Sequence, residues 1–282
     1  MSTPAAPAPK QRVGISTITF RFRPFEEAVR LIGATGADEV DLGALPGVCD
    51  HVPVPFTGDP QDYVAELERH GLRAGAVNGD VGPLNDPALD AETLRATALP
   101  LVRLAAVTGG ALILPGGGQS WDPYVDEDAD IERIAANLRL MSTLCAEHGV
   151  RLLVEVLHHR RFCWSVARAD KLLALVGPDT MGLLLDTSHV VASDEDLVAW
   201  ATKHADRVER VHLRDAVPGN LNLGIGRGKV DFRGTMAVLE AAGFTGTYVL
   251  ELETHDVEEH EREADAQRSF DEMTALLAEV QR

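Results

Sequence analysis

Short apolar runs rich in β-branched residues alternate along the chain with longer segments of helical period, and this alternation repeats eight times. Most of the helical segments end near a glycine, as at Gly36, Gly71 and Gly109, which matches the preference for a left-handed residue after a helix. Eight strand–helix rounds in 282 residues predict an α/β protein whose single domain is a (β/α)₈ TIM barrel.

The boundaries of the elements follow from the same periodicity. The predicted strands are Val13–Thr17, Glu39–Leu42, Arg73–Asn78, Ala111–Leu114, Arg151–Val156, Met181–Asp186, Val208–Leu213 and Thr247–Leu252. A doubly wound parallel sheet is the alternative, but no glycine-rich dinucleotide turn follows the first strand. The composition does not shift along the chain, so we expect one barrel over residues 12–282 after a flexible, Pro- and Ala-rich leader at residues 1–11.

The composition argues against several classes of protein. The 44 acidic residues outnumber the 26 basic ones, and the resulting net charge of −18 repels a phosphate backbone, so nucleic acid is a poor partner. No apolar stretch approaches the roughly 20 residues of a membrane span. The 3 cysteines are far apart and form none of the close pairs of thiolate metal sites. We therefore expect a cytoplasmic protein, with no membrane association, that acts on a small molecule.

Ionisable side chains lie at the ends of the four late predicted strands. Glu155, Asp186, His212 and Glu251 belong to the fifth, sixth, seventh and eighth strands. A barrel gathers these strand ends on one face, where this fold places its chemistry. Two glutamates, an aspartate and a histidine form a mixed oxygen and nitrogen ligand set. Such a set suits a borderline divalent ion, Mn²⁺ first, with Mg²⁺, Co²⁺ and Zn²⁺ as alternatives.

These residues resemble the motifs of the xylose-isomerase-like TIM-barrel superfamily, which holds sugar phosphate isomerases and epimerases, inosose dehydratases and endonuclease IV. The matching residues are Glu155, Asp186 and His189 in D-x-x-H, His212 in H-L-R-D, Gly226-x-Gly228-x-Val230-Asp231-Phe232, and Glu251 after Tyr248-Val249-Leu250. The resemblance covers the chain from about Val13 to the last helix. It implies one divalent metal held by Glu155, Asp186, His212 and Glu251, with the two glutamates serving also as acid and base.

Four other side chains are predicted to contact the substrate: His158, His189, Arg214 and Arg227. The D-x-x-H pair also fits a capped helix start in which His189 only bonds to Asp186. His158 follows the fifth strand and either hangs over the barrel mouth or lies in a solvated basic loop. Arg227 lies in a Gly-x-Gly-x-Gly run that resembles a nucleotide loop, but this run follows the seventh strand, so we interpret it as a loop of the barrel itself.

A site of this kind favours proton transfer on an α-hydroxyketone. A divalent ion that chelates neighbouring oxygens stabilises the negative charge of a cis-enediolate. Glu155 and Glu251 could then remove and return the proton from opposite faces. We therefore expect a metal-dependent sugar isomerase or epimerase acting on a ketose, aldose or polyol ketone. Glu253, two residues after Glu251 and on the same face, is the alternative carboxylate of the eighth strand.

Three other functions stay open. A lyase on this scaffold, such as an inosose dehydratase or a C-glycoside-cleaving subunit, would expel a β-leaving group from the same intermediate. An enzyme of the endonuclease IV type needs more histidine ligands from early strands, where this chain has Asp41 and Asn78, with His51 well beyond. A non-catalytic sugar-binding subunit is expected to lack one of the paired glutamates, and both are present. The superfamily often dimerises, which makes a homodimer a further expectation.

Overall fold

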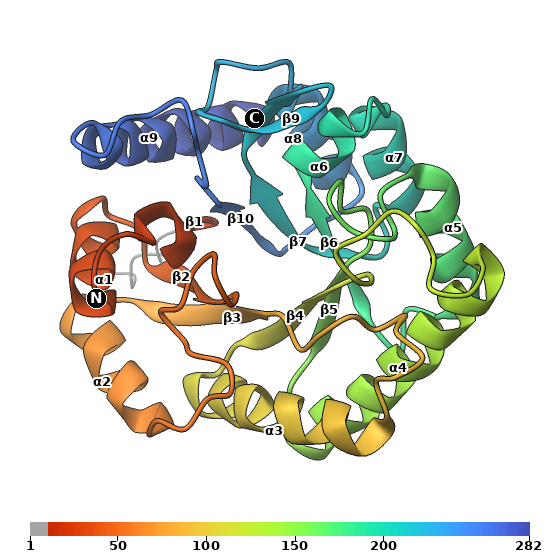
Figure 1. Ribbon diagram of the computed structural model, residues 1–282. Coiled ribbons are helices and arrows are strands. Elements are labelled where there is room, and N and C mark those ends of the chain that lie inside the picture. The colour runs from red at the N-terminus through yellow and green to blue at the C-terminus, as the bar shows by residue number, and fades with distance from the viewer. Residues whose placement is uncertain (1–10) are drawn as a thin grey trace, which may run out of the picture.

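A closed barrel of eight parallel strands forms the centre of the computed structural model, which describes residues 11–282 (Figure 1). The strands are β1 (Val13–Ser16), β2 (Glu39–Ala44), β3 (Arg73–Gly79), β4 (Ala111–Pro115), β5 (Leu152–Glu155), β6 (Gly182–Asp186), β7 (Val208–Leu213) and β10 (Thr247–Leu250). Around the barrel they follow one another in chain order, and β10 closes onto β1. The predicted TIM barrel is confirmed; the predicted leader at residues 1–11 lies outside the described residues except for residue 11.

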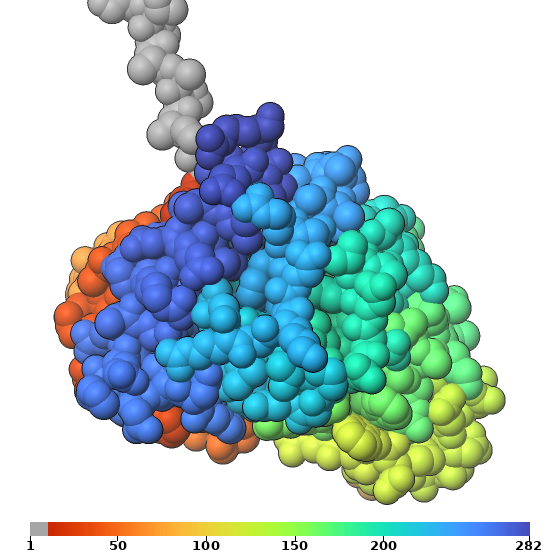
Figure 2. Space-filling view, turned by 90° about the horizontal axis from the view of Figure 1, so that it is seen from above, coloured from red at the N-terminus to blue at the C-terminus, as the bar shows by residue number. Residues whose placement is uncertain are grey.

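Helices surround the barrel and alternate with its strands. They are α1 (Phe25–Ala34), α2 (Pro60–Arg69), α3 (Ala91–Thr108), α4 (Glu127–Glu147), α5 (Val166–Leu175), α7 (Leu197–His204), α8 (Phe232–Ala241) and α9 (Arg262–Val280). Several begin at an aspartate whose carboxylate accepts a backbone N–H of the first turn, as Asp90 does at α3 and Asp196 at α7. The last helix packs against β1, and Figure 2 shows the blue C-terminal segments lying against the red N-terminal ones, which closes the ring.

Three short elements at the carboxyl ends of the strands were not predicted from the sequence. They are the 3₁₀ helix η1 (Thr17–Phe20), the helix α6 (Thr187–Ala192), and the antiparallel hairpin of β8 (Asp215–Val217) and β9 (Asn220–Leu223). Asp186 starts α6 because its carboxylate accepts the backbone N–H groups of Ser188 and His189. The hairpin follows β7 directly, so it stands at the end of the barrel that carries the predicted site.

The interior of the barrel has an apolar half and an ionic half. Four apolar side chains pack together inside β3 to β6: Ala76, Ile113, Leu153 and Leu184. Inside β2 and β7 lie four buried ionisable side chains instead: Glu39, Asp41, Arg210 and His212. Gly75 makes room for them, because a Cβ there would collide with the Arg210 guanidinium and the Glu39 carboxylate. Buried charged side chains therefore lie beneath the side of the predicted site that β2 and β7 form.

The larger core lies between the strands and the outer helices and is built mainly from Leu, Val, Ile and Ala side chains. Among the described residues, none of the helices combines the length and the apolar content that crossing a membrane requires.

Candidate metal centre and substrate pocket

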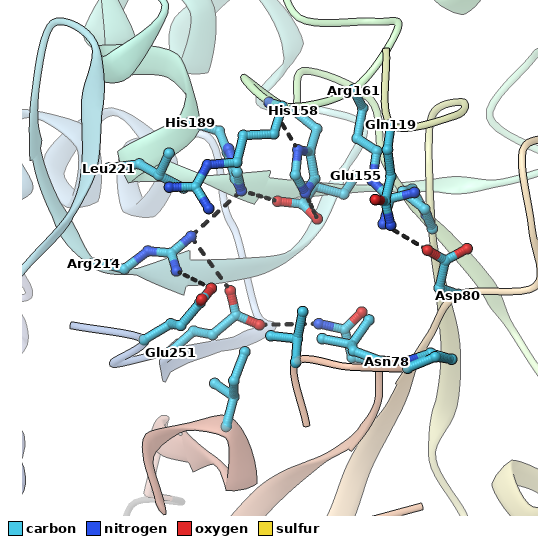
Figure 3. Close-up of a pocket in the computed structure, with 17 residues that line it drawn as sticks. Asn78, Asp80, Gln119, Glu155, His158, Arg161, His189, Arg214, Leu221 and Glu251 are labelled. Carbon is cyan, nitrogen blue, oxygen red and sulfur yellow. Dashed lines mark hydrogen bonds and ion pairs between the residues drawn. The ribbon is translucent and has the colours of Figure 1, made fainter. Parts of the chain in front are cut away.

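A cavity of about 300 Å³ opens at the carboxyl ends of the strands (Figure 3). Five of the predicted site residues line it: Glu155, His158, His189, Arg214 and Glu251. Apolar side chains form another part of the wall: Ile18, Leu45, Pro46, Val48 and Leu221. A volume at the lower end of the range for ligand pockets, with a few convergent polar groups, fits a small molecule.

Three of the four predicted metal ligands form one buried cluster. Asp186, His212 and Glu251 each offer a ligand atom, and these atoms all lie within 4.8 Å of one another. Asp186 is the last residue of β6 and is aligned with His212 on β7, while Glu251 directly follows β10. We call these three residues the deep trio. The fourth predicted ligand, Glu155, is not part of it.

The orientation of His212 is fixed by a carboxylate beneath it. The Nε2 of His212 lies 3.0 Å from the Oδ2 of Asp41, and Arg210 also donates to this carboxylate, at 2.8 Å to Oδ2 and at 2.6 Å to Oδ1. The Nδ1 of His212 therefore faces the site, 3.2 Å from the Oε1 of Glu251. A metal-ligating histidine usually donates its other N–H to a carboxylate in this way.

Charge around His212 overcomes the effect of burial. Burial by itself lowers the pKa of His212, but the Glu251 and Asp41 carboxylates outweigh it and raise that pKa to about 10. The pKa of Asp41 is lowered, since Arg210 and His212 outweigh the burial that would raise it. The ring thus carries a proton between carboxylates at neutral pH, and a cation at Nδ1 would take the place of that proton.

Glu155 forms a second cluster with two histidines, which we call the mouth trio. The Nε2 of His189 lies 3.3 Å from one carboxylate oxygen of Glu155, and the Nε2 of His158 lies 3.7 Å from the other. The ligand atoms of Glu155, His158 and His189 also lie within 4.8 Å of one another. The two imidazole rings lie against each other, with centroids 3.7 Å apart.

Burial keeps the mouth trio close to neutral. It raises the pKa of Glu155 well above its ordinary value, and the nearby Asp186 and Glu251 charges raise it further. Burial also lowers the pKa of both His158 and His189 well below the ordinary value of histidine. A carboxyl group whose pKa is raised by burial accepts a proton more readily, which suits general acid–base catalysis.

The predicted ligands contain buried polar atoms without hydrogen-bond partners. These atoms are Oε1 of Glu155, Oδ2 of Asp186 and Nδ1 of His212. Buried polar atoms are nearly always satisfied, so a cluster of exceptions needs a reason. A divalent cation would supply the missing partner, and the carboxylate and imidazole donors are those that such ions take. The residues present therefore fit a metal ion.

Arg214 extends from the end of β7 into the cavity, where Figure 3 shows it between His189 and Glu251. Its Nε donates to the hydroxyl of Ser188 at 3.0 Å, and its Nη1 donates to Glu253 at 3.3 Å. Glu253 also forms an ion pair of 2.6 Å with Arg21. Glu253 thus lies between two arginines and outside the deep trio.

Arg227 lies apart from the cavity. Its guanidinium donates to the backbone carbonyl of Asp256 at 2.6 Å, and it is not among the side chains that line the cavity. In the glycine run around it, the backbone N–H groups of Gly226 and Gly228 donate to the carboxylate of Asp215 at 2.9 and 2.8 Å. A side chain of the protein therefore occupies the position that a phosphate would take in a nucleotide loop.

Two residues of the site were not predicted as functional. Asp41 holds His212, and Asn78 on β3 donates from its Nδ2 to the Oε1 of Glu251 at 3.0 Å. A sequence signal for Asp41 does exist. Glu39 and Asp41 are two residues apart in an apolar strand, and so are Arg210 and His212, which places each pair on one face of its strand.

Comparison with known proteins agrees with this fold. An inosose dehydratase from Geobacillus thermodenitrificans is 28% identical over 155 residues, which are 48% of each chain, so this chain matches about half the length of that relative. A D-psicose 3-epimerase from Clostridium cellulolyticum H10, solved with D-tagatose, superposes with a TM-score of 0.76 at 16% identity and covers 95% of this chain and 99% of its own. The IOLI protein, solved with a zinc atom, gives a TM-score of 0.77 at 14% identity and covers the same shares. The sequence profile of the xylose isomerase-like TIM barrel family matches residues 27–276, and the chain belongs to that family.

Proposed function

We propose that this protein is a divalent-metal-dependent isomerase or epimerase that moves a proton next to the carbonyl group of a small sugar or cyclitol ketone. The observation that carries the proposal is a set of buried ligand atoms without hydrogen-bond partners on Glu155, Asp186 and His212. Glu155 lines the small-molecule cavity, and Asp186 and His212 cluster with Glu251, which also lines it. Relatives that are named sugar epimerases and inosose dehydratases support the class of substrate.

The deep trio would hold the ion, and Glu155 would complete the ligand set from the mouth. When bound, such an ion withdraws electrons from a carbonyl oxygen and makes the neighbouring C–H more acidic. We propose Mn²⁺, with Mg²⁺, Co²⁺ and Zn²⁺ as alternatives that carboxylates and one imidazole also accept.

The two glutamates would exchange the proton. They lie on opposite sides of the cavity in Figure 3, Glu155 from β5 and Glu251 beyond β10, which suits attack on the two faces of one carbon. The raised pKa of Glu155 lets it hold the proton that it removes. Asn78 holds the Glu251 carboxylate in place, and Arg214 and His189 offer N–H donors to the substrate oxygens. The apolar wall excludes water around the intermediate.

A lyase is the second candidate, because the curated relatives that this chain matches are named inosose dehydratases. The first step would be the same proton removal by a glutamate. The intermediate would then lose a β-hydroxyl group, which needs an acid that His189 or the other glutamate could supply. The products distinguish the two, since isomers have equal mass and a dehydration product is lighter by one water.

Proton exchange in D₂O tests the proposal directly. The protein is loaded with Mn²⁺, incubated with ketoses, aldoses and inososes, and freed of the metal before NMR spectra are recorded. Deuterium at a carbon next to a carbonyl is the expected result, and it reports proton removal whatever the product. A metal-stripped sample is the control. If no substrate in the panel exchanges while the metal is bound, the protein is not an isomerase, epimerase or lyase of these compounds.

We propose no nucleic-acid or membrane partner, since the net charge of −18 disfavours phosphate polymers and the cavity is of small-molecule size. A homodimer and a cytoplasmic location remain part of the proposal.

A further inference from the structure

The mouth trio has the composition and the spacing of a second metal site. Glu155, His158 and His189 offer one oxygen and two nitrogens within 4.8 Å of one another, as the deep trio does. Whether an imidazole can bind a metal depends on which of its nitrogens faces the site. A neutral ring has one N–H and one lone pair, and only the nitrogen with the lone pair can be a ligand.

The backbone decides this for His189. The N–H of His159 donates to the Nδ1 of His189 at 3.1 Å, so the lone pair is at Nδ1 and the hydrogen is at Nε2. The Nε2 is the atom that faces Glu155 and the cavity. The Nη2 of Arg214 lies 3.4 Å from the same Nε2. The backbone N–H of His159 has a fixed direction, and its contact with His189 is the shorter of the two. We therefore assign the Arg214 contact as two N–H groups side by side, with no hydrogen bond between them.

His158 is held in the same way. The backbone N–H of Arg160 donates to the Nδ1 of His158 at 3.3 Å, which leaves the hydrogen at Nε2. That Nε2 faces Glu155 at 3.7 Å, too far for a hydrogen bond. Since the rings of His158 and His189 lie against each other, their two N–H groups enter the cavity together. His212 differs, because its Nε2 bonds to Asp41 and its Nδ1 faces the site.

We propose that His158 and His189 are a pair of neutral N–H donors that bind a substrate oxygen beside Glu155, and that the chain holds one metal ion rather than two. This inference rests on the proposed function and adds His158 to its catalytic residues. Two fixed donors beside a proton-transferring carboxylate would stabilise negative charge that develops on that oxygen. Arg214 adds a third donor, whose Nη2 lies 3.4 Å from the Nε2 of His189.

Nitrogen NMR tests the orientation without any substrate. With ¹⁵N-labelled histidine, both His158 and His189 are expected to show a protonated Nε2 and a bare Nδ1, with or without Zn²⁺. Only His212 should shift at Nδ1 when Zn²⁺ is added. Variants His158→Gln and His189→Gln assign the signals. A bare Nε2 on either ring, or a Zn²⁺-induced shift at that atom, would overturn the proposal.

Metal content and kinetics test the two halves of the proposal separately. Bound Zn²⁺ per chain should be one in the protein and unchanged in His158→Leu, whereas His212→Leu should lose it. Two ions in the protein and one in His158→Leu would overturn the inference and leave the proposed function intact. No ion in either would contradict the proposed function, and the NMR result would still decide the orientation.

The kinetic effect of His158 should follow its N–H group. Loss of one neutral hydrogen bond is expected to lower kcat/KM about 3- to 10-fold in His158→Leu, and His158→Gln, which keeps an N–H, should recover part of this loss. His148→Leu, at the end of α4, is the control for removal of a distant histidine. Equal kcat/KM in His158→Leu and the protein on a turned-over substrate would count against the donor pair.

Discussion

The deep trio and the mouth trio contain similar side chains at similar spacing, yet the protein holds them differently. In the deep trio a carboxylate, Asp41, accepts the Nε2–H of His212, so the nitrogen that faces the site is Nδ1, where a metal ion would replace the proton. In the mouth trio, backbone N–H groups donate to the Nδ1 atoms of His158 and His189, so the Nε2–H groups of both rings face the cavity. Ligand spacing alone therefore does not make a ligand; the contact on the far side of each ring decides its role.

The barrel interior beneath the deep trio is charged, and the interior beneath the mouth trio is apolar. Under His212 lie Arg210 and Asp41, so charge at the deep trio is balanced from below. Under Glu155 lies Leu153, two residues earlier on the same face and part of the apolar interior cluster. An apolar floor favours the neutral form of the carboxyl group above it. The ionic half suits binding a cation, and the apolar half suits proton transfer.

The largest expected effects come from Glu155→Gln and Glu251→Gln, one residue from each trio. Loss of a positioned general base typically lowers the rate about 10²–10⁴-fold. Both variants should lose turnover, and Glu251→Gln should weaken metal binding more than Glu155→Gln, because Glu251 belongs to the deep trio and Glu155 only completes the ligand set from the mouth. In an epimerase, each variant should still exchange the proton of one epimer without converting it. Glu66→Gln on α2 is the control.

If both variants kept bound metal and full turnover, neither glutamate would have the role proposed for it. If Glu155→Gln lost metal while Glu251→Gln kept it, the roles of the two trios would be reversed, since the mouth trio would then hold the ion.

Removing the metal should destabilise the protein, since a ligand that binds only the folded state adds stability. The free energy of unfolding rises by RT ln(1 + [L]/Kd), about 2.7 kcal/mol when the free ion is at 100 times its Kd. Denaturant unfolding with and without EDTA measures it. His212→Leu, which lacks a ligand of the deep trio, should respond to neither EDTA nor metal. Equal stability of the parent protein in both conditions would argue against a metal site.

Asp41→Asn tests the contact beneath His212. Loss of an outer partner of a metal ligand typically weakens metal binding about 10- to 100-fold. The fold should persist, because Arg210 keeps an ion pair of 2.9 Å with Glu39. Asp170→Asn is a matched control, since Asp170 contacts the Nε2 of His204 at 3.0 Å on the outer surface and far from the site. Calorimetric titration with Mn²⁺ measures the affinity. Equal Kd values for the parent protein, Asp41→Asn and Asp170→Asn would show that Asp41 does not support metal binding.

The sequence predicts the barrel well because the signals for it are local. Periodicity and turn glycines lie within each round, and four strand-end residues identify the active face. It does not predict that Asp41 supports His212, because this contact joins β2 and β7 across 171 residues. It also does not predict that Glu155 clusters with His158 and His189, because that cluster depends on how the segments after β5 and β6 meet. The hydrogen bond that Asp186 makes to begin α6 is local, yet a D-x-x-H pair allows a cap and a ligand equally. Which nitrogen of a histidine faces a site depends on contacts that only the fold creates.

The smallest effect is expected for Glu253→Gln, which tests the end of the eighth strand. Glu253 follows Glu251 by two residues, but its carboxylate pairs with Arg21 and Arg214 instead of joining the deep trio. The Glu253 side chain is 16% exposed, and Gln keeps an amide oxygen that can accept from both guanidinium groups. Metal content should stay unchanged, and KM should rise less than about tenfold, because Arg214 loses a charged partner and keeps a hydrogen-bond acceptor. Atomic absorption and steady-state kinetics check both. Loss of metal in Glu253→Gln, with metal kept in Glu251→Gln, would move the eighth-strand ligand by two residues and place Arg214 beside the ion instead of the substrate.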